Sequence, residues 1–255
     1  MAATSYLARF SLEGRTALVT GAARGLGFEI ARALALSGAA VVLNGRDAVR
    51  LDEAAQRIAA EGGRVATAVF DIADDERAAG FLGGMERLDI LVNNVGARDR
   101  RKLAQFEDAA IRRLIDTDLV AAIMLAREAA ARMTERGSGR IIMITSIAGQ
   151  VAGPSDAVYT AAKAGLAGLV RALAVEYGAH GITTNAIAPG FFATETNAHL
   201  VTDKAASAYF EGRTPLARWG RPDEIAGAAV FLASDAASYV NGHVLVVDGG
   251  ATVRM

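Results

Sequence analysis

The 255-residue chain has no cysteine, which excludes disulfides, thiolate zinc sites and cysteine nucleophiles. Such a chain fits a reducing compartment, and we expect a cytoplasmic protein. Only three histidines are present, and they are scattered without metal-binding spacing, so no metal site is expected. A net charge of −1 gives no electrostatic reason to expect a nucleic-acid partner.

Long apolar runs are also lacking. No stretch reaches the roughly 18 uncharged apolar residues that a membrane helix needs, so we expect no membrane partner. Residues 1–10 contain no apolar run that would indicate a secretory signal. Apolar residues nevertheless make up 52% of the chain and charged residues 22%, a balance typical of a globular protein with a large core.

Short apolar runs alternate with helical periodicity from end to end. Strands are predicted at 16–20, 40–44, 64–70, 88–92, 140–145, 182–188 and 243–247, and helices at 28–37, 48–61, 74–86, 107–136, 157–178 and 224–234. This alternation predicts an α/β fold, a doubly wound (Rossmann) parallel sheet of seven strands with helices on both faces. We expect a single domain over 1–255, with a short N-terminal extension at 1–11. The polar, poorly periodic stretch 191–213 is a candidate lid.

A glycine-rich turn follows the first predicted strand and precedes the first predicted helix. Its residues, in a Gly-x-x-x-Gly-x-Gly spacing, are Gly21, Ala22, Ala23, Arg24, Gly25, Leu26 and Gly27. Glycines let the backbone approach a pyrophosphate, and the helix N-terminus supplies free N–H groups and a positive dipole end. This context predicts a dinucleotide site, the alternative being a plain tight turn.

The residue after the second strand bears on which dinucleotide is bound. An acidic side chain there binds the ribose 2′-OH of NAD, whereas a basic one accommodates the 2′-phosphate of NADP. This chain has Gly45-Arg46, and Arg24 adds a second guanidinium, a group well shaped for phosphate. We therefore predict NADP in preference to NAD, unless both arginines are simply solvated.

Polar groups follow the next two strands. Asp71 and Ile72 come after the third strand, and Asn93, Asn94, Val95 and Gly96 after the fourth. Polar groups at strand carboxyl ends face the ligand crevice of a doubly wound sheet. These amides could bind a ribose or form only an Asn-rich turn.

The densest basic run follows at 98–102 and includes Arg98, Arg100 and Arg101. It is either a solvated loop or a local attractor for an anionic substrate.

Tyr159 and Lys163 lie one helical turn apart, and Ser146 precedes the tyrosine by thirteen residues. A positive charge nearby lowers the pKa of a tyrosine, so that the phenol can exchange a proton with an alcohol or carbonyl oxygen. Read alone, such a pair is more often an ordinary surface pair, and the other motifs supply the case for chemistry.

Taken together, these motifs in this order resemble the short-chain dehydrogenase/reductase family over essentially the whole chain, with Pro189-Gly190 and Asp248-Gly249-Gly250 completing the series. The resemblance implies that Tyr159 is the general acid/base, that Lys163 lowers its pKa and holds the nicotinamide ribose, and that Ser146 positions the substrate oxygen. It also implies that Asp71 touches the adenine, Asn93 the adenosine ribose side and Thr194 the carboxamide. The implied cofactor-binding set is Gly21, Arg24, Gly25, Leu26, Gly27, Arg46, Asp71, Ile72, Asn93, Val95, Gly96, Tyr159, Lys163, Pro189, Gly190, Phe192 and Thr194.

The chain departs from the family pattern at two positions. Val95 stands where the family has the smaller alanine. Asp118 stands where the family has an asparagine that supports a water chain to the lysine. We count Asp118 among the catalytic residues, on the hypothesis that its oxygens still accept that hydrogen bond. A carboxylate there could instead stabilise the ammonium of Lys163 and weaken its effect on Tyr159.

Several stretches resemble the branch of this family that interconverts gluconate and 5-ketogluconate, usually with NADP. They are 41–46, Arg100-Arg101, 191–195 and 213–220, whereas the loop 147–155 does not match. The expected function is hydride transfer between the nicotinamide of NADP and a small polar hydroxyl or carbonyl substrate, with gluconate the best guess. Alternatives are a 3-oxoacyl-[acyl-carrier-protein] reductase and an NADP-binding sensor or scaffold without catalysis.

Assembly is suggested by two helix faces. Small residues gather on the helix that carries Tyr159, at Ala164, Gly165, Ala167 and Gly168, and the predicted helix 107–136 has a broad apolar face. The family resemblance implies a homotetramer with D₂ symmetry, or a homodimer, built through these helices. Both faces could instead belong to the internal core.

Overall fold

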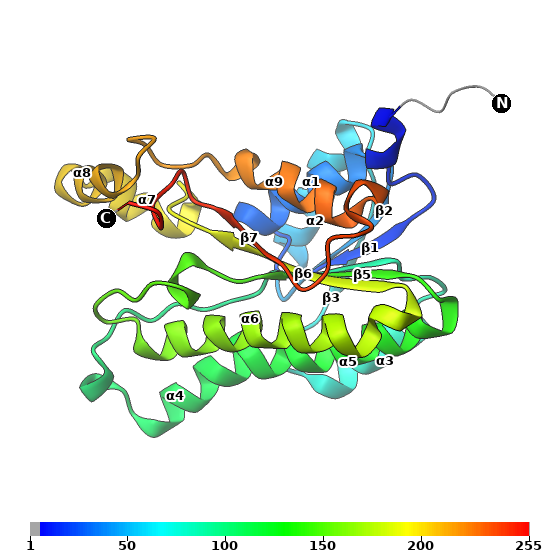
Figure 1. The fold of residues 1–255 in the computed structure, drawn as a ribbon, viewed down its shortest axis with the longest axis horizontal. Helices are drawn as coiled ribbons and strands as arrows, with labels where there is room; N and C mark the ends of the chain where they lie inside the picture. The colour runs from blue at the N-terminus through cyan, green and yellow to red at the C-terminus, as the bar shows by residue number, and fades with distance from the viewer. Residues whose placement is uncertain (1–5, 255) are drawn as a thin grey trace.

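The computed structural model of the chain describes residues 6–254 and contains one seven-stranded parallel sheet (Figure 1). The strands are β1 (Thr16–Val19), β2 (Ala40–Gly45), β3 (Arg64–Val69), β4 (Ile90–Asn93), β5 (Gly139–Ile144), β6 (Ile182–Pro189) and β7 (Val244–Val247). Their order across the sheet is β3-β2-β1-β4-β5-β6-β7. The predicted doubly wound α/β fold is confirmed.

Helices cover both faces of the sheet, as Figure 1 shows. On one face lie α1 (Gly25–Leu36), α2 (Ala48–Ala60) and α9 (Ala226–Ala233), and on the other α3 (Asp75–Gly84), α4 (Asp108–Ile115), α5 (Ala121–Arg136) and α6 (Ala157–Tyr177). Each face buries its own apolar cluster against the strands. The strands read as continuous apolar runs because both of their faces are covered.

The order in which the chain adds strands reverses at β1: β2 and β3 lie on one side of it, and β4 to β7 lie on the other. Ala17, for example, is in register with Val41 of β2 and with Ile90 of β4. In such sheets ligands bind outside the carboxyl ends of the strands at this switch point. In Figure 1 the segment after β6, with α7 (Ala198–Thr202) and α8 (Lys204–Arg213), lies at that end of the sheet, on the left.

Two segments differ from the sequence-based expectation. The helix expected at 107–136 is α4 and α5 joined by a π-helical turn, η3 (Asp116–Val120). Periodicity cannot reveal one wider turn inside an otherwise regular apolar pattern. The stretch 191–213, expected to be irregular, contains η6 (Glu195–Asn197), α7 and α8. The side chain of Asp203 caps α8 by accepting hydrogen bonds from two backbone N–H groups.

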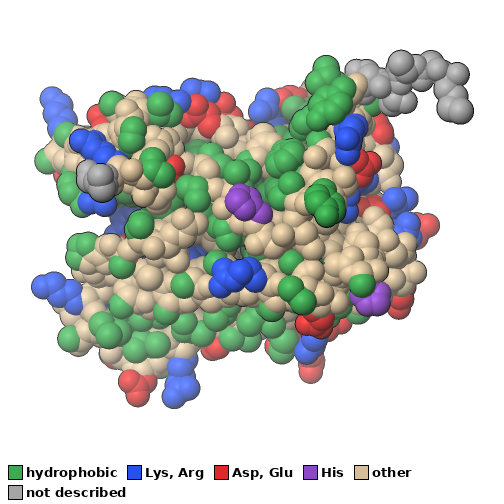
Figure 2. Space-filling view, in the orientation of Figure 1, with side chains coloured by type: hydrophobic (Ala, Val, Ile, Leu, Met, Phe, Trp, Pro, Cys, Tyr) green, Lys and Arg blue, Asp and Glu red, His purple; other side chains and the backbone are tan. Residues whose placement is uncertain are grey.

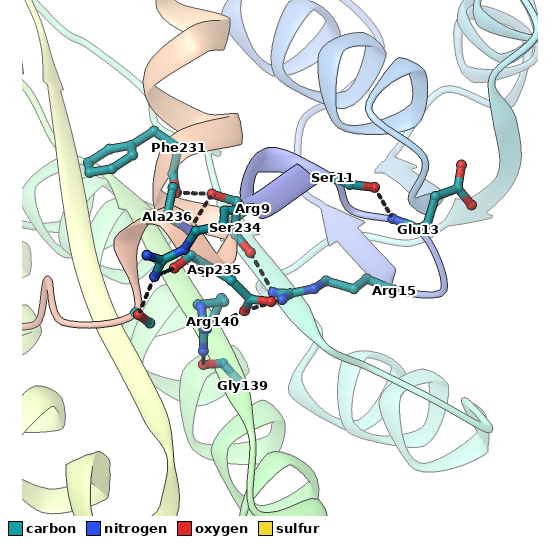
Figure 3. Close-up of polar contacts among 12 residues, drawn as sticks. Arg9, Ser11, Glu13, Arg15, Gly139, Arg140, Phe231, Ser234, Asp235 and Ala236 are labelled. Atoms are coloured by element: carbon teal, nitrogen blue, oxygen red, sulfur yellow. Dashed lines mark hydrogen bonds and ion pairs between the residues drawn. The ribbon is translucent and has the colours of Figure 1, made fainter. Parts of the chain in front are cut away.

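The amino-terminal end of the sheet carries a cluster of charged residues, which we call the amino-end cluster: Arg9, Arg15, Arg140 and Asp235 (Figure 3). Arg15 pairs with Asp235 and also donates to the carbonyl of Ala233 at 2.7 Å. Arg140 lies 3.3 Å from the same carboxylate, and Arg9 donates to the Asp235 carbonyl at 2.9 Å. The cluster ties η1 (Tyr6–Phe10), β1 and β5 to the end of α9; of the expected extension 1–11, residues 1–5 lie outside the described part.

The stretch Ala157–His180, which includes α6, is the one helical segment of residues 6–254 that is long and apolar enough to cross a membrane by length and composition. Its buried side chains pack against the sheet, among them Leu166 and Val170, in the same apolar cluster as α3 and α5. A helix with one face in the core and a buried lysine near its start is typical of a globular fold.

Candidate active site

The glycine-rich turn between β1 and α1 requires glycine on steric grounds. Gly21 and Gly25 have φ angles of +62° and +59°, in the left-handed region. A Cβ on Gly27 would lie 2.3 Å from the carbonyl oxygen of Gly21 and 2.4 Å from Nδ2 of Asn94. The turn is therefore tight, and its backbone is accessible to a ligand that approaches closely.

The start of α1 has unused hydrogen-bonding capacity. Arg24 occupies the N-cap position but its side chain caps no N–H group, and the first turn has no acidic residue. Free N–H groups and the positive end of the helix dipole fit a phosphate. The exposed guanidinium of Arg24 lies at the same turn. These residues fit the predicted dinucleotide, which would supply a hydride donor or acceptor at its nicotinamide.

The two asparagines after β4 have different surroundings. Asn94 donates from Nδ2 to the carbonyls of Thr20 and Gly21, at 3.0 and 3.2 Å, and so fixes the glycine-rich turn. Asn93 is buried and donates to the carbonyl of Ala122 in α5, at 3.2 Å. The predicted ribose contact of Asn93 would therefore involve its backbone. The paired asparagines were visible in the sequence, but which of them holds the turn was not.

Arg46 and Asp71 lie side by side at the carboxyl ends of β2 and β3. Nη1 of Arg46 is 3.4 Å from Oδ2 of Asp71, and the arginine side chain is 79% exposed. Ile72 is buried in the core, so only its backbone is available to a ligand. An exposed guanidinium beside the adenosine end of the crevice suits a 2′-phosphate.

The segment after β6 lies next to the glycine-rich turn. A Cβ on Gly25 would lie 3.8 Å from Cγ2 of Thr194. Pro189 ends β6, and Gly190 is needed there because a Cβ would lie 2.6 Å from that of Asp248. The ring of Phe192 is buried in the core, which leaves its backbone for the predicted contact.

Tyr159 and Lys163 both face the carboxyl end of β5 from the first turns of α6. Nζ of Lys163 is 3.4 Å from the carbonyl of Ile144 and 5.6 Å from the centre of the Tyr159 ring. Gly96 makes room for it, since a Cβ there would lie 2.7 Å from Nζ. Ser146 follows β5 and accepts a hydrogen bond from the N–H of Ala148, which leaves its own O–H free to donate.

Asp118 reaches this site from the π-helical turn. It is fully buried, and Oδ1 accepts a hydrogen bond of 2.6 Å from the N–H of Ala97. Oδ2 lies 3.7 Å from Nζ of Lys163 and makes no hydrogen bond within the described chain. Asp118 thus fixes the loop after β4 with one oxygen and faces the lysine with the other.

Burial dominates the ionisation of these three groups. It raises the pKa of Tyr159, although the Ser146 hydroxyl and the charge of Arg98 oppose this rise. It lowers the pKa of Lys163, with Asp118 opposing, and raises the pKa of Asp118, with Lys163 opposing. Two cations lie near the Tyr159 ring: the carbon of the Arg98 guanidinium is 5.2 Å from its centre and Nζ of Lys163 is 5.6 Å from it, and the charge of Arg98 lowers the pKa of the phenol.

A hollow of about 590 Å³ opens between the loop after β4, α4 and the segment after β6. Figure 2 shows the surface hollowed on the left, between the upper and the lower helical layer, with basic side chains at the edge of the hollow. Arg98 and Arg101 line it but are paired, with Asp156 and Asp99. The hollow is also lined by two arginines with no acidic partner within residues 6–254, Arg100 and Arg113.

The sequence did not single out Arg113, which enters from α4, a helix whose position in space the sequence leaves open. The only available signal was a pair of arginines at the end of an amphipathic stretch, and such a pair is usually solvated. The assembled site can donate or accept a proton at Tyr159, hold a dinucleotide at the glycine-rich turn, and attract an anion into the hollow.

The chain is similar to known dehydrogenases and reductases over nearly its whole length. The family model described as Enoyl-(Acyl carrier protein) reductase matches residues 21–252. Gluconate 5-dehydrogenase of Gluconobacter oxydans (strain 621H) is 44% identical over 96% of this chain and 98% of its own length. 5-keto-D-gluconate 5-reductase of Escherichia coli (strain K12) is 36% identical over 96% of this chain and 98% of its own.

Among solved structures, the chain is similar to a gluconate 5-dehydrogenase from Burkholderia cenocepacia J2315 in complex with NADP and tartrate. The TM-score is 0.93 with 41% sequence identity, and the match covers 98% of this chain and 99% of that one. The likeness therefore extends over the whole sheet and over the segments that surround the hollow.

Proposed function

Because this chain belongs to the short-chain dehydrogenase/reductase family, we propose that it is an NADP-dependent oxidoreductase that interconverts a hydroxyl and a carbonyl group on a small sugar acid. Gluconate and 5-ketogluconate are the best candidate pair. The observation that carries the proposal is the hollow lined by Arg98, which lies over Tyr159, and by Arg100 and Arg113, whose guanidinium groups have no acidic partner within residues 6–254. The lining contains four arginines and one aspartate, and a cavity with such an excess of positive charge attracts an anion, here a carboxylate.

The proton transfer falls to residues of α6 and the end of β5. In reduction, the O–H of Tyr159 donates its proton to the carbonyl oxygen of the substrate, while Ser146 donates a hydrogen bond to the same atom. In oxidation, the Tyr159 phenolate accepts the hydroxyl proton. Burial raises the pKa of Tyr159, so the protonated form predominates at neutral pH and oxidation becomes faster as the pH rises.

The cofactor site is proposed on the glycine-rich turn, with NADP favoured over NAD. Arg24 and Arg46 would donate hydrogen bonds to the 2′-phosphate, and Lys163 would hold the nicotinamide ribose. Thr194, in the segment that touches Gly25, would contact the carboxamide. The relative from Burkholderia cenocepacia, solved with NADP and the hydroxy acid tartrate, supports both halves of this proposal.

An activity screen tests the function. Purified protein is supplied with NADPH and NADH, and separately with NADP and NAD, over a panel of sugar acids, polyols and β-keto esters. We expect turnover of 5-ketogluconate with NADPH and of gluconate with NADP. Preference for NADH would overturn the role of Arg24 and Arg46. Turnover of β-keto esters alone would favour a reductase of carrier-bound acyl chains, and tight NADPH binding without any turnover would favour a sensor.

The subunits are proposed to associate through helices as a homotetramer or homodimer. Val175 on α6 is 86% exposed, and the face over α6 in Figure 2 is mostly uncharged. Val120 and Ile123 are exposed at the start of α5. Gly165 is internal, since a Cβ there would lie 2.9 Å from Leu119, so only part of the small-residue face is available. A sedimentation measurement that finds only monomers would overturn this assembly.

The location and the lid are also proposals. A cytoplasmic location is supported by the absence of cysteine and by the small-molecule redox chemistry proposed above. A lid at 191–213 is supported by the position of Thr196, Asn197 and His199, which line the hollow opposite the basic loop.

A further inference from the structure

Arg98 lies directly over the ring of Tyr159. The carbon atom of its guanidinium group is 5.2 Å from the ring centre, slightly closer than Nζ of Lys163 at 5.6 Å. Arg98 comes from the loop after β4, so the tyrosine lies near a cation from its own helix and one from outside it. A guanidinium at this distance stabilises negative charge on the ring oxygen.

Arg98 is held in that position by Asp156. Its Nε donates to Oδ1 at 2.9 Å, and a second N–H donates to Oδ2, which makes the pair bidentate. The side chain of Asp156 is 7% exposed and that of Arg98 34%. Asp156 occupies the N-cap position of α6, but its side chain caps no N–H group, since its carboxylate is engaged with the arginine.

The backbone around Asp156 is also unusual. Ser155, the preceding residue, has a φ angle of +63°, in the left-handed region that residues other than glycine rarely adopt. Such conformations persist where the surrounding structure imposes them, and they gather at functional sites. The strained residue and the bidentate pair together point to a built arrangement that sets the direction of Arg98.

Several charged or polar groups face Tyr159 besides Arg98: Ser146 after β5, Lys163 on α6, Asp118 on η3, Asp156 before α6 and Arg100 on the loop after β4. Of the charges that move the pKa of Tyr159, Arg98 has the largest effect and lowers it, while Asp118 and Asp156 raise it by less. Lys163 faces the carboxylate of Asp118 at 3.7 Å, which offsets its charge.

We propose that Arg98 and Asp156 form a positioning pair, in which Asp156 directs Arg98 over Tyr159 so that the guanidinium charge stabilises the phenolate. The pair takes over part of the role expected of Lys163, whose charge is offset here by Asp118. The proposal rests on Tyr159 being the acid/base of the proposed function, but it concerns the phenol itself and not the substrate.

Ultraviolet titration of the phenolate tests this in the protein without substrate or cofactor. The signal of Tyr159 is isolated by subtracting the titration of the matching Tyr159→Phe variant. We expect Arg98→Gln to raise the midpoint of Tyr159 by about 1 pH unit. Arg112→Gln, which removes an exposed arginine of α4 outside the hollow, controls for net charge and leaves the midpoint unchanged. An unchanged midpoint in Arg98→Gln would overturn the proposal.

Asp156→Asn tests the positioning by its sign. If Asp156 acted only through its own negative charge, the midpoint of Tyr159 would fall in this variant. If it holds Arg98 over the ring, the midpoint rises, and adding Asp156→Asn to Arg98→Gln changes little further. A fall of the Tyr159 midpoint in Asp156→Asn alone would overturn the proposed positioning pair. Arg98→Lys keeps the charge but cannot bind in a bidentate manner, so it gives an intermediate shift and serves if Arg98→Gln does not fold.

Kinetics separate this role from substrate binding once a substrate is known. The positioning role predicts that the acid limb of kcat for oxidation moves to higher pH in Arg98→Gln. A rise in KM with an unchanged pH profile would make Arg98 a substrate ligand and overturn the proposal. Failure of the sugar-acid screen would leave the phenolate titration interpretable, so the two proposals fail separately.

Discussion

The two ends of β5 carry charged clusters of opposite character. At its start, Arg140 belongs to the amino-end cluster, where three arginines surround Asp235, whose side chain is 60% exposed. Beyond its end, Lys163 and Asp118 form a pair with side chains 3% and 0% exposed. The amino-end cluster uses backbone carbonyls and a solvated carboxylate, whereas Oδ2 of Asp118 makes no hydrogen bond within the described chain.

The difference shows where this fold places costly charges. The amino-end cluster forms around Asp235, whose side chain is 60% exposed, and ion pairs to such a solvated carboxylate stabilise a protein only slightly. A buried pair at 3.7 Å, with unused acceptor capacity, is expensive unless another interaction compensates for it. The carboxyl-end charges surround Tyr159, so we attribute their burial to function. We assign the amino-end cluster to anchoring the N-terminal segment and α9.

Tyr159→Phe is the strongest test of the view that the carboxyl end of β5 serves catalysis and its amino end serves stability. Removing the phenolic O–H should lower turnover by about 10³-fold, roughly 4 kcal/mol of activation free energy, because the proton transfer loses its donor and acceptor. The free energy of unfolding should hardly change. Turnover and denaturant unfolding are measured together, with the fully exposed Tyr239→Phe as the control. Turnover above a tenth of that of the parent protein would remove Tyr159 from the reaction.

Asp118→Asn tests what the buried pair of Asp118 and Lys163 does. The carboxylate raises the pKa of Tyr159 and also that of Lys163, so its removal should lower both. The acid limb of oxidation should then move to lower pH by less than about 1 unit, with maximal turnover within about threefold, since the amide oxygen still accepts from the N–H of Ala97. Asp118→Leu, which leaves that N–H unpaired, should be less stable by about 1–3 kcal/mol. A marked rise in turnover for Asp118→Asn would show that Asp118 is a compromise.

Asp235→Asn tests the amino-end cluster. Arg15 holds the pKa of Asp235 below its ordinary value, so the folded state gains stability at pH values above the ordinary carboxyl range and loses it as the pH falls through the lowered pKa. Because the group is largely exposed, we expect a loss of only about 1 kcal/mol at neutral pH, decreasing on acidification. Urea unfolding at several pH values measures this. A loss of activity with unchanged stability would contradict the assignment of the amino-end cluster to stability.

Arg140→Met should have the smallest effect. Arg140 is buried, its Nε has no hydrogen-bond partner among residues 6–254, and burial lowers its pKa. Replacing a buried charge by an apolar side chain of similar length removes a desolvation cost, so the free energy of unfolding should change by less than about 1 kcal/mol in either direction. Unfolding in urea and turnover provide the check. A loss above about 2 kcal/mol would mean that the ion pair of Arg140 with Asp235 stabilises the fold by more than the burial of the arginine costs.

Most of the fold could be predicted because the sheet is parallel and covered on both faces. Buried strands such as β4 and β5 read as apolar runs, and the glycine-rich turn and Tyr159-x-x-x-Lys163 have fixed local spacings. The π-helical turn at Asp118 could not be predicted, since one wider turn leaves the apolar pattern intact. The two helices within 191–213 have too little periodicity to be recognised.

The sequence by itself determined the sheet, the place of the nucleotide turn and the identity of the acid/base candidate, because each depends on neighbours along the chain. Tertiary structure alone decided which charges act on Tyr159. Arg98 and Asp156 are 58 residues apart, and Lys163 meets Asp118 from another helix. Electrostatic effects depend on distance and burial, and neither can be read from spacing along the chain once the groups lie on different elements.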